Sequence, residues 1–316
     1  MNAAKTLLLT LPLALGFVAL AQAEPLDRTQ VAAGAKWLAH IDFDAARAAK
    51  VAPRVYDEWL SRGMANRALE DVRETIGMNL LEDVRGITFY GARFQPFSGV
   101  VIVLAKVNEE RLLELLRANA SHRVEAFGNH ELHTWVQEVD ATHKSTVTGC
   151  FYGPSLVVVG RDADEVRSAL GVLDGAAPRL AGSGSPLDRE AAKGTVFQGG
   201  VIGLADLAGE RLPFVSPIIR HAESLVLDLG EDDGEVVLRA RLGTRSPEIA
   251  GRVRDVLLGF RGMTALERDG DEYMLKALDA LKIAAEGRTV AIDWRMPGVD
   301  VMRLVENEWA KQRKAN

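Results

Sequence analysis

The stretch WLAHIDFD, residues 37–44, decides how the first half of this sequence is interpreted. It is an apolar, strand-like run that ends in acidic residues. An acidic side chain at that point can accept hydrogen bonds from the first turn of a helix, so the stretch predicts a strand followed by a helix with Asp44 as its cap. The second half opens in the same way, because GVIGLAD, residues 200–206, ends in Asp206.

Both halves then continue with the same order of expected elements. The first half shows strands at 84–92 and 99–107, a helix from 109, a strand at 156–159 and a helix at 162–173. The second half shows strands at 224–229 and 235–242, a helix that starts at Ser246-Pro247, a strand at 289–294 and a helix at 297–309. We also expect an extra hairpin in the first half and an extra helix at 272–285 in the second.

Strand–helix–strand–strand–helix–strand is the order of the split βαβ unit. The sequence therefore predicts an α+β protein made of two ferredoxin-like (split βαβ) units in tandem, with antiparallel-rich sheets and helices on one face. The alternative is that these elements recur by chance, as they do in many α+β proteins.

Glycine, serine and proline gather near the middle of the chain, in DGAAP at 174–178 and AGSGSP at 181–186. Such composition marks an irregular connection. We therefore divide the chain into a signal peptide at 1–23, a first α+β domain at 24–178, a linker at 179–194 and a second α+β domain at 195–316.

The first 23 residues have the pattern of a secretory signal peptide. Lys5 supplies a positive start, residues 7–20 are almost wholly apolar, and Ala21-Gln22-Ala23 forms a small-x-small cleavage site. The apolar run is short for a membrane-spanning helix, although an uncleaved anchor is the alternative. We expect cleavage after Ala23, a soluble periplasmic or secreted product, and no transmembrane segment after cleavage.

Three segments extend this interpretation: residues 37–42 (WLAHID), residues 83–91 (DVRGITFYG) and the strand-to-helix segment 155–170. In these segments the chain resembles secreted bacterial proteins that contain a duplicated domain of unknown function. The resemblance implies export and internal duplication, and it carries no activity and no functional residues with it.

Charge and composition limit the possible partners and chemistry. The net charge is −6, whereas a phosphate backbone is bound mainly by Lys and Arg, so nucleic acid is not an expected partner. Cys150 is the only cysteine, which excludes an internal disulfide, and its apolar neighbours predict a buried side chain. The sequence contains no Gly-x-Ser-x-Gly elbow, phosphate-binding loop or dinucleotide fingerprint.

One cluster suggests chemistry, and it lies on the extra hairpin. Residues 123–127 and 130–136 are strand-like, and Gly128-Asn129 between them suits a two-residue turn. That register places His122, Glu131 and His133 on one side of the hairpin. Two imidazoles and a carboxylate are ligands for a divalent metal such as zinc. The alternative is a solvated hairpin face on which the histidines are incidental.

Two functional hypotheses follow from the whole sequence. The leading one is an exported, non-catalytic binding or envelope-associated protein without a cofactor. We expect it to bind an unknown protein or small ligand in the cell envelope, through a sheet face or the cleft between its halves. The alternative is a metal-dependent hydrolase or metal-binding protein that uses His122, Glu131 and His133. A scaffold in an envelope assembly is a third reading. No catalytic motif decides whether the protein is an enzyme.

Overall fold

The computed structural model describes residues 25–54, 70, 73–74, 77–95, 98–138, 144–204 and 217–315. The expected signal peptide and the expected cap Asp206 lie outside these residues. The chain divides into a first unit, Met1–Ala48 with Ala52–Glu190, and a second unit, Ala49–Val51 with Ala191–Asn316.

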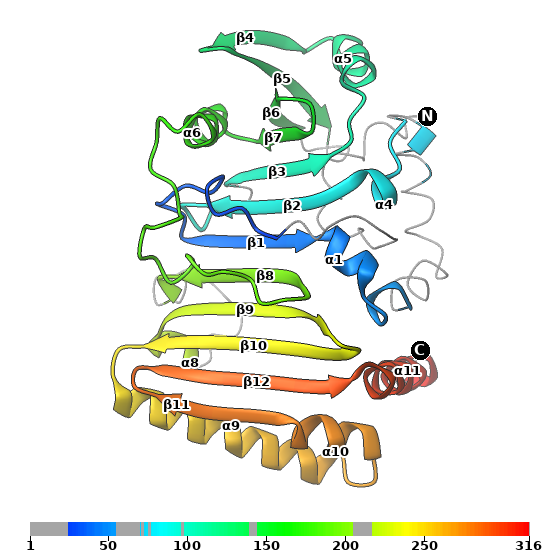
Figure 1. Ribbon diagram of the computed structural model, residues 1–316, viewed down its shortest axis with the longest axis vertical. Coiled ribbons are helices and arrows are strands. Elements are labelled where there is room, and N and C mark those ends of the chain that lie inside the picture. The colour runs from blue at the N-terminus through cyan, green and yellow to red at the C-terminus, as the bar shows by residue number, and fades with distance from the viewer. Residues whose placement is uncertain are drawn as a thin grey trace. The chain divides into compact units, whose positions relative to one another are not determined.

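Seven strands of the first unit form a sheet in the order β1-β2-β3-β7-β6-β5-β4, and each neighbouring pair is antiparallel (Figure 1). The strands are β1 (Trp37–Asp42), β2 (Val84–Gly91), β3 (Val100–Ala105), β4 (Arg123–Phe127), β5 (His130–Glu138), β6 (Lys144–Tyr152) and β7 (Leu156–Gly160). The helices described in this unit are α1 (Phe43–Ala48), α4 (Leu80–Asp83), α5 (Glu109–Arg117) and α6 (Ala163–Leu173).

The core beneath the first strands follows from their alternation. Every second residue of β1 is buried, on the face that carries Leu38, His40 and Asp42. On the opposite face, Ile41 packs against a buried apolar cluster of Phe43, Val84, Ile87 and Ala105. The opening stretch of sequence thus forms a strand and then a helix, as predicted, and its first aromatic residue after the strand anchors that core.

The prediction of ferredoxin-like units is wrong. In a split βαβ unit the third strand lies between the first and the second, so the first two strands, which are joined by a helix that crosses one face of the sheet, are not neighbours. Here β1 pairs with β2, β2 with β3 and β3 with β7, always antiparallel. The short helices α1 and α4 lie at the ends of β1 and β2 rather than crossing a face (Figure 1). The architecture is dominated by antiparallel sheet.

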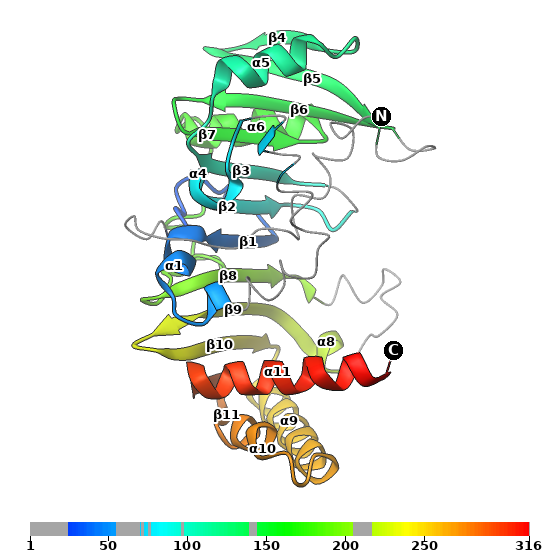
Figure 2. The ribbon, with the colours of Figure 1, turned by 90° about the vertical axis from the view of Figure 1, so that its right-hand side faces the viewer.

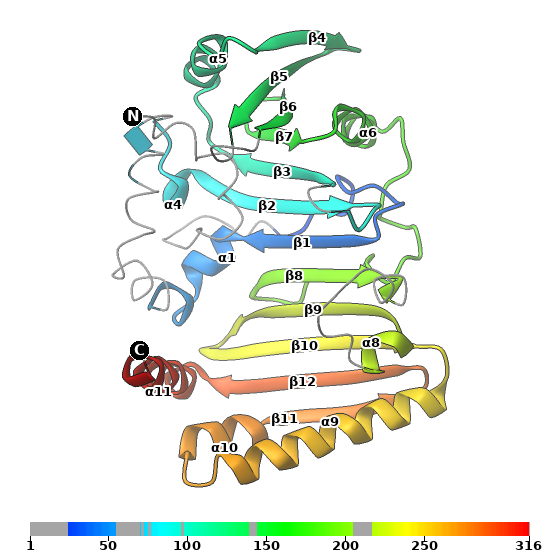
Figure 3. The ribbon, with the colours of Figure 1, turned by 180° about the vertical axis from the view of Figure 1, so that it is seen from behind.

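The second unit has five strands in the order β8-β9-β10-β12-β11, also antiparallel. The strands are β8 (Thr195–Ile202), β9 (Ala222–Asp232), β10 (Glu235–Thr244), β11 (Leu281–Glu286) and β12 (Thr289–Pro297), and the helices described are α8 (Pro217–His221), α9 (Pro247–Glu267), α10 (Glu272–Asp279) and α11 (Gly298–Ala315). Seen from behind in Figure 3, α9 lies across β11 and β12, and Figure 2 shows α11 lengthwise beside α10.

The expected helix at 272–285 is only half correct. Its first part is α10, capped by Asp271, whose side chain accepts a hydrogen bond from the backbone of Met274. Its second part is strand β11, which pairs with β12 along its whole length. The segment LKIAAE favours a helix by composition, but its alternating half-buried and exposed residues suit an edge strand, and pairing with β12 decides the outcome.

The starts of α5 and α9 were predicted more accurately than the pairing of the strands. Asn108 and Ser246 cap α5 and α9, with side chains that accept hydrogen bonds from the backbone of Arg111 and Ile249. Pro247 occupies the first position of α9, where a missing N–H is harmless. These local signals depend only on neighbouring residues, which explains why they can be recognised in the sequence.

Candidate functional site

The histidine hairpin forms in the predicted register. Phe127 pairs with His130 and Val124 with His133, and Gly128 in the turn has φ +60°, a left-handed value that favours glycine. His133 is 5% exposed, while β4 is exposed along most of its length. The hairpin therefore ends the first unit's sheet with one open strand and one strand that is half covered.

His122 and His133 lie against each other across this hairpin. His122 Nε2 is 3.2 Å from His133 Nδ1. The ring planes are 9° apart. The ring centroids are 5.4 Å apart, which is nearly the largest centroid separation possible for a nitrogen–nitrogen distance of 3.2 Å. The rings therefore meet edge to edge, with one nitrogen donating a hydrogen bond to the other. One of the two imidazoles must be neutral to accept it.

Burial and charge both act on this pair. Burial lowers the pKa of His133, and a charged His122 beside it lowers that pKa further. Glu131 and Glu109 raise the pKa of His133, whereas Arg117 of α5 lowers it, as His122 does. Neutral His133 is thus the favoured form in the folded chain.

Glu131 completes the predicted trio but does not converge with it. Its Oε2 lies 4.0 Å from His133 Nε2, on the far side of that ring from His122, and its side chain is 74% exposed. No group of three His, Cys, Asp or Glu side chains in the described ranges is arranged to hold a metal ion. The structure brings the three predicted residues near one another, and metal binding by them stays a prediction.

His130 and Cys150 are held in contacts that give neither of them an obvious reactive role. His130 Nε2 lies 3.0 Å from both carboxylate oxygens of Asp174, and its ring contacts Tyr152. Cys150 is buried, as predicted, and burial raises the pKa of its thiol to about 11. A thiol in this state is protonated at neutral pH and is a poor nucleophile.

A feature that we did not predict lies on the outer side of α9. Val256, Phe260, Met263 and Leu266 are 45%, 57%, 58% and 81% exposed. Gly259 is exposed among them. Residues three or four apart on a helix are neighbours, so these five residues form one continuous strip, which we call the α9 surface.

The opposite side of α9 explains why the strip was missed. Ala250 and Val253 are buried, and with Ile249 and Leu257 they pack into the core of the second unit. The sequence pattern predicts Ile249, Val253, Val256 and Leu257 as the buried face, and Val256 is the exception. Because α9 is apolar on both sides in its second half, periodicity alone does not separate the covered face from the open one.

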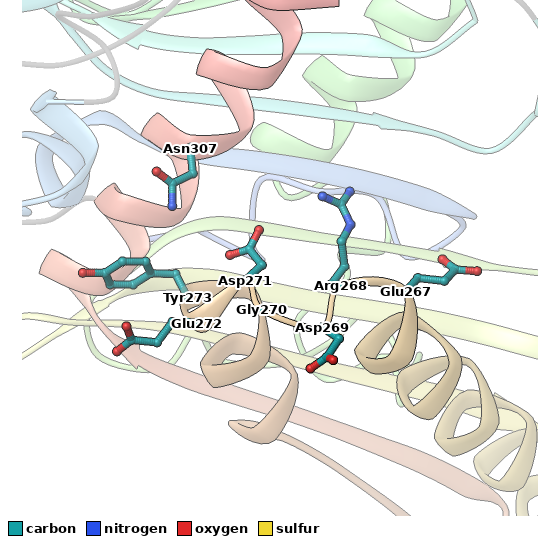
Figure 4. Close-up of a pocket in the computed structure, with 8 residues that line it drawn as sticks. All are labelled: Glu267, Arg268, Asp269, Gly270, Asp271, Glu272, Tyr273 and Asn307. Carbon is teal, nitrogen blue, oxygen red and sulfur yellow. The ribbon is translucent and has the colours of Figure 1, made fainter.

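A hollow of about 530 Å³ lies at the turn between α9 and α10 (Figure 4). Its lining is Glu267, Arg268, Asp269, Gly270, Asp271, Glu272, Tyr273 and Asn307. Figure 4 shows that the carboxylates point in different directions. Asp271 is occupied as the cap of α10, and Glu272 pairs with Lys276 at 2.8 Å. The hollow is open, and its acidic groups do not converge on a ligand position.

Within the described ranges, the helices are all too short or too polar to cross a bilayer.

Comparison with family models and with curated proteins gives no match. Among solved structures, the chain is similar to TP0453 in its crystal forms III, I and IV, with 9%, 10% and 7% sequence identity. The alignments cover 90%, 89% and 90% of this chain and 98%, 97% and 97% of the other, with TM-scores of 0.46, 0.45 and 0.45. A likeness at this level supports no functional conclusion, so the proposals below rest on the residues of this chain.

Proposed function

We propose that this chain is an exported, non-catalytic binding protein and that the α9 surface is where it binds. The observation that carries the proposal is the exposure of Phe260 and Met263, on adjacent turns of a helix whose other side is already packed. Contiguous apolar side chains facing water mark interaction sites more often than single ones do.

The gain from covering this surface is large enough to matter. Full burial of a Phe or Met side chain is worth about 1.5–3 kcal/mol each, and these two are a little over half exposed. Covering both therefore stabilises a complex by about 2–3 kcal/mol, which is at least tenfold in affinity. Val256 and Leu266 extend the same contact.

The surroundings of the candidate reactive groups support the non-catalytic part of the proposal. Cys150 is buried and protonated, and the hydrogen bond between His122 and His133 occupies a nitrogen of each ring. Export is supported by the signal-peptide pattern of residues 1–23.

Site-specific photocross-linking tests the binding surface. A photoreactive residue at position 260, introduced into the chain as produced in bacteria, is expected to give a discrete adduct. The matched position is Val299 on α11, which is 64% exposed and lies outside the α9 surface. The adduct at 260 should disappear with Met263→Ser and persist with Val299→Ser. Equal adducts at 260 and 299, or no effect of Met263→Ser, would contradict the proposal.

A second candidate is a divalent-metal site on the histidine hairpin. Two nitrogens on one tetrahedral zinc ion lie about 3.3 Å apart, close to the 3.2 Å between His122 Nε2 and His133 Nδ1. Turning one ring would let both nitrogens face a common ion, with Glu131 nearby. Zinc titration of chelator-treated protein should then show one equivalent that His133→Ala removes, and absence of binding in the unchanged chain would rule the site out.

A further inference from the structure

One edge of the first unit's sheet is formed by β4. This strand is last in the sheet order, pairs with β5, and is exposed along nearly its whole length (Figure 2). A two-residue turn closes the β4–β5 hairpin, so Phe127 and His130 exchange hydrogen bonds and the bonding alternates from there. The N–H and C=O groups of Val124 and Ala126 therefore point away from β5. They form an edge to which another extended chain can add.

Three side chains give this edge its character. Val124 is 52% exposed and lies on the same side of the hairpin as His122. Arg123 and Glu125 are exposed on the opposite side, where Glu125 pairs with Arg167 of α6 at 2.9 Å. Within the part of the chain that the structure describes, Arg123 makes no ion pair. The edge thus presents one uncovered apolar side chain and one cation without a counter-charge.

Helix α5 gives a second, independent indication at the same edge. Leu112, Leu115 and Leu116 share one side of this helix. None of the residues of α5 is buried, and Leu115 is 38% exposed. Figures 1 and 2 both show α5 next to the end of β4. The apolar side of α5 is therefore incompletely covered where the sheet ends.

We propose that β4 pairs with β4 of a second copy of this chain, antiparallel, with Val124 opposite Val124 on a two-fold axis normal to the sheet. In this register the two Val124 residues exchange two hydrogen bonds, and each Ala126 N–H donates to the His122 carbonyl oxygen of the other copy. Arg123 of each copy stands opposite Glu125 of the other, and the two Val124 side chains cover one another. The contact lies in the first unit, so it goes beyond the binding proposed for the α9 surface and does not depend on it.

Charge selects this register among the possible two-fold arrangements. An axis at Arg123 or at Glu125 would set like charges directly opposite one another, which is destabilising. An axis at Ala126 would oppose Val124 to Gly128, which does not continue the strand because it turns with φ +60°. The axis at Val124 uses the outward backbone groups and gives each charge its opposite. One strand thus supplies both halves of a self-complementary contact, as a two-fold interface requires, and this is the reason for assigning the edge to a second copy.

The size of the contact sets the expected affinity. Strand β4 has five residues, so the pair buries less than the roughly 1,200 Å² of a standard stable interface. We expect a weak dimer, with a dissociation constant on the order of 10–100 µM.

Sedimentation velocity on residues 24–316 tests the proposal at concentrations from about 1 to about 200 µM, over which the unchanged chain should shift from monomer to dimer. Val124→Pro removes an N–H that points away from β5, a change that edge strands tolerate, and should weaken association at least about tenfold. Val124→Ile retains the N–H and should retain association. Phe260→Ser alters the α9 surface and should leave this dimer unchanged, which separates the two proposals.

Charge reversal tests the register. Arg123→Glu alone and Glu125→Arg alone each set like charges opposite one another, so each protein should associate more weakly than the unchanged chain. An equimolar mixture of the two should regain association, because every opposed pair in the mixed dimer then carries unlike charges. Circular dichroism melts of each variant confirm folding.

Cross-linking tests the position of the axis. The Val124→Cys protein should form a disulfide with itself, because the Cα atoms of hydrogen-bonded partners lie about 5.5 Å apart, within the range that a disulfide spans. The Ala126→Cys protein should not, since its position lies opposite 122 rather than itself. The native Cys150 is buried and does not compete.

Several outcomes overturn the β4 contact. These are a monomer at all concentrations, association that Val124→Pro leaves intact, or a Val124→Cys protein that cross-links only when mixed with the Ala126→Cys protein. Association that is lost with Phe260→Ser instead assigns self-association to the α9 surface and overturns the contact as well. A monomer leaves the function proposed for α9 standing, and loss of the adduct at position 260 leaves the β4 contact standing.

Discussion

Asp44 is a carboxylate with no exposed surface, and two arginines hold it. One of its oxygens accepts a hydrogen bond from Arg47, which also donates from Nη1 to the carbonyl oxygen of Val84 at 2.8 Å. Its other oxygen accepts from Arg85 Nε at 3.0 Å. Taking charges out of water costs several kcal/mol per ion, so each member of this group depends on the others.

Replacing Asp44 by Ala should lower the free energy of unfolding by about 3–5 kcal/mol, because the variant removes one partner of a buried ion pair. The chain offers a matched control. Asp164 pairs with Arg167 at the same i, i+3 spacing, but its side chain is 88% exposed, so Asp164→Ala should cost less than about 1 kcal/mol. Urea unfolding of both variants measures the difference, and equal losses would show that the buried group is not coupled.

The same residue shows where sequence reasoning stops. The sequence predicts Asp44 as the cap of the first helix, whereas the carboxylate that accepts from the backbone N–H of Ala45, at 2.7 Å, belongs to Asp42. A sequence with Asp at both positions offers two caps two residues apart. Which one is used depends on where pairing with β2 stops, and Asp42 opposite Gly86 is the last pair.

The histidine pair predicts a pH dependence with a defined sign. Because the pKa of His133 is lower in the folded chain than in the unfolded chain, the folded state binds fewer protons. Stability is then complete above the unfolded value of about 6.5 and falls as the pH drops through that value toward the folded pKa.

Urea unfolding at about pH 7.5 and about pH 5 should show this loss in the unchanged chain and a smaller loss in His133→Gln. His221 is exposed, so His221→Gln serves as the control and should retain the pH dependence. An identical decline in the unchanged chain and in His133→Gln would mean that other groups cause it.

At the scale of elements, two signals that are local in sequence were confirmed. Ser246-Pro247 marks the start of α9, and the Gly128-Asn129 turn fixes the hairpin register that brings His122 to His133. The α9 surface was not predictable in this way. Val256 and Val253 have the same apolar character, and only the placement of α9 over β10–β12 decides that one is buried and the other is open.

The junction between the start of β8 and the end of β9 allows a test of close packing. A Cβ atom on Gly194 would lie 2.0 Å from the carbonyl oxygen of Glu231, and the residue has φ +75°. Gly175 has nearly the same φ, +74°, but a Cβ atom there would meet nothing within 4 Å. The two glycines therefore share a left-handed backbone conformation and differ in the space around them.

Gly175→Ala should cost about 1–2 kcal/mol of unfolding free energy, which is the penalty of a left-handed conformation. Gly194→Ala should cost at least about 2 kcal/mol more, since β8 and β9 must also separate. Thermal and urea unfolding of both variants measure the two losses. Similar values would mean that the junction relaxes without cost.

At the scale of the whole molecule, the order of elements was largely predicted and their pairing was not. Strands β2, β3 and β7 and helix α6 occur close to where the periodicity places them. The same order suits both a split βαβ unit and the observed sheet, in which β1, β2, β3 and β7 are consecutive neighbours, because alternation within β1 does not say which strand lies beside it. Pairing is set by contacts distant in sequence. Whether the two halves arose by duplication stays a prediction.

Export is the property of the whole chain that can be tested most directly. If residues 1–23 are a signal peptide, bacteria that produce the full sequence should release a protein whose first residue is Glu24 into the periplasmic fraction. The cleavage site requires small side chains at positions 21 and 23, so Ala23→Leu together with Ala21→Leu should leave the uncleaved chain in the membrane fraction. Intact mass and N-terminal sequencing of each fraction separate these forms. An unchanged chain found uncleaved in the cytoplasmic fraction would remove export from the proposed function and leave the binding surface on α9 to be judged by its own tests.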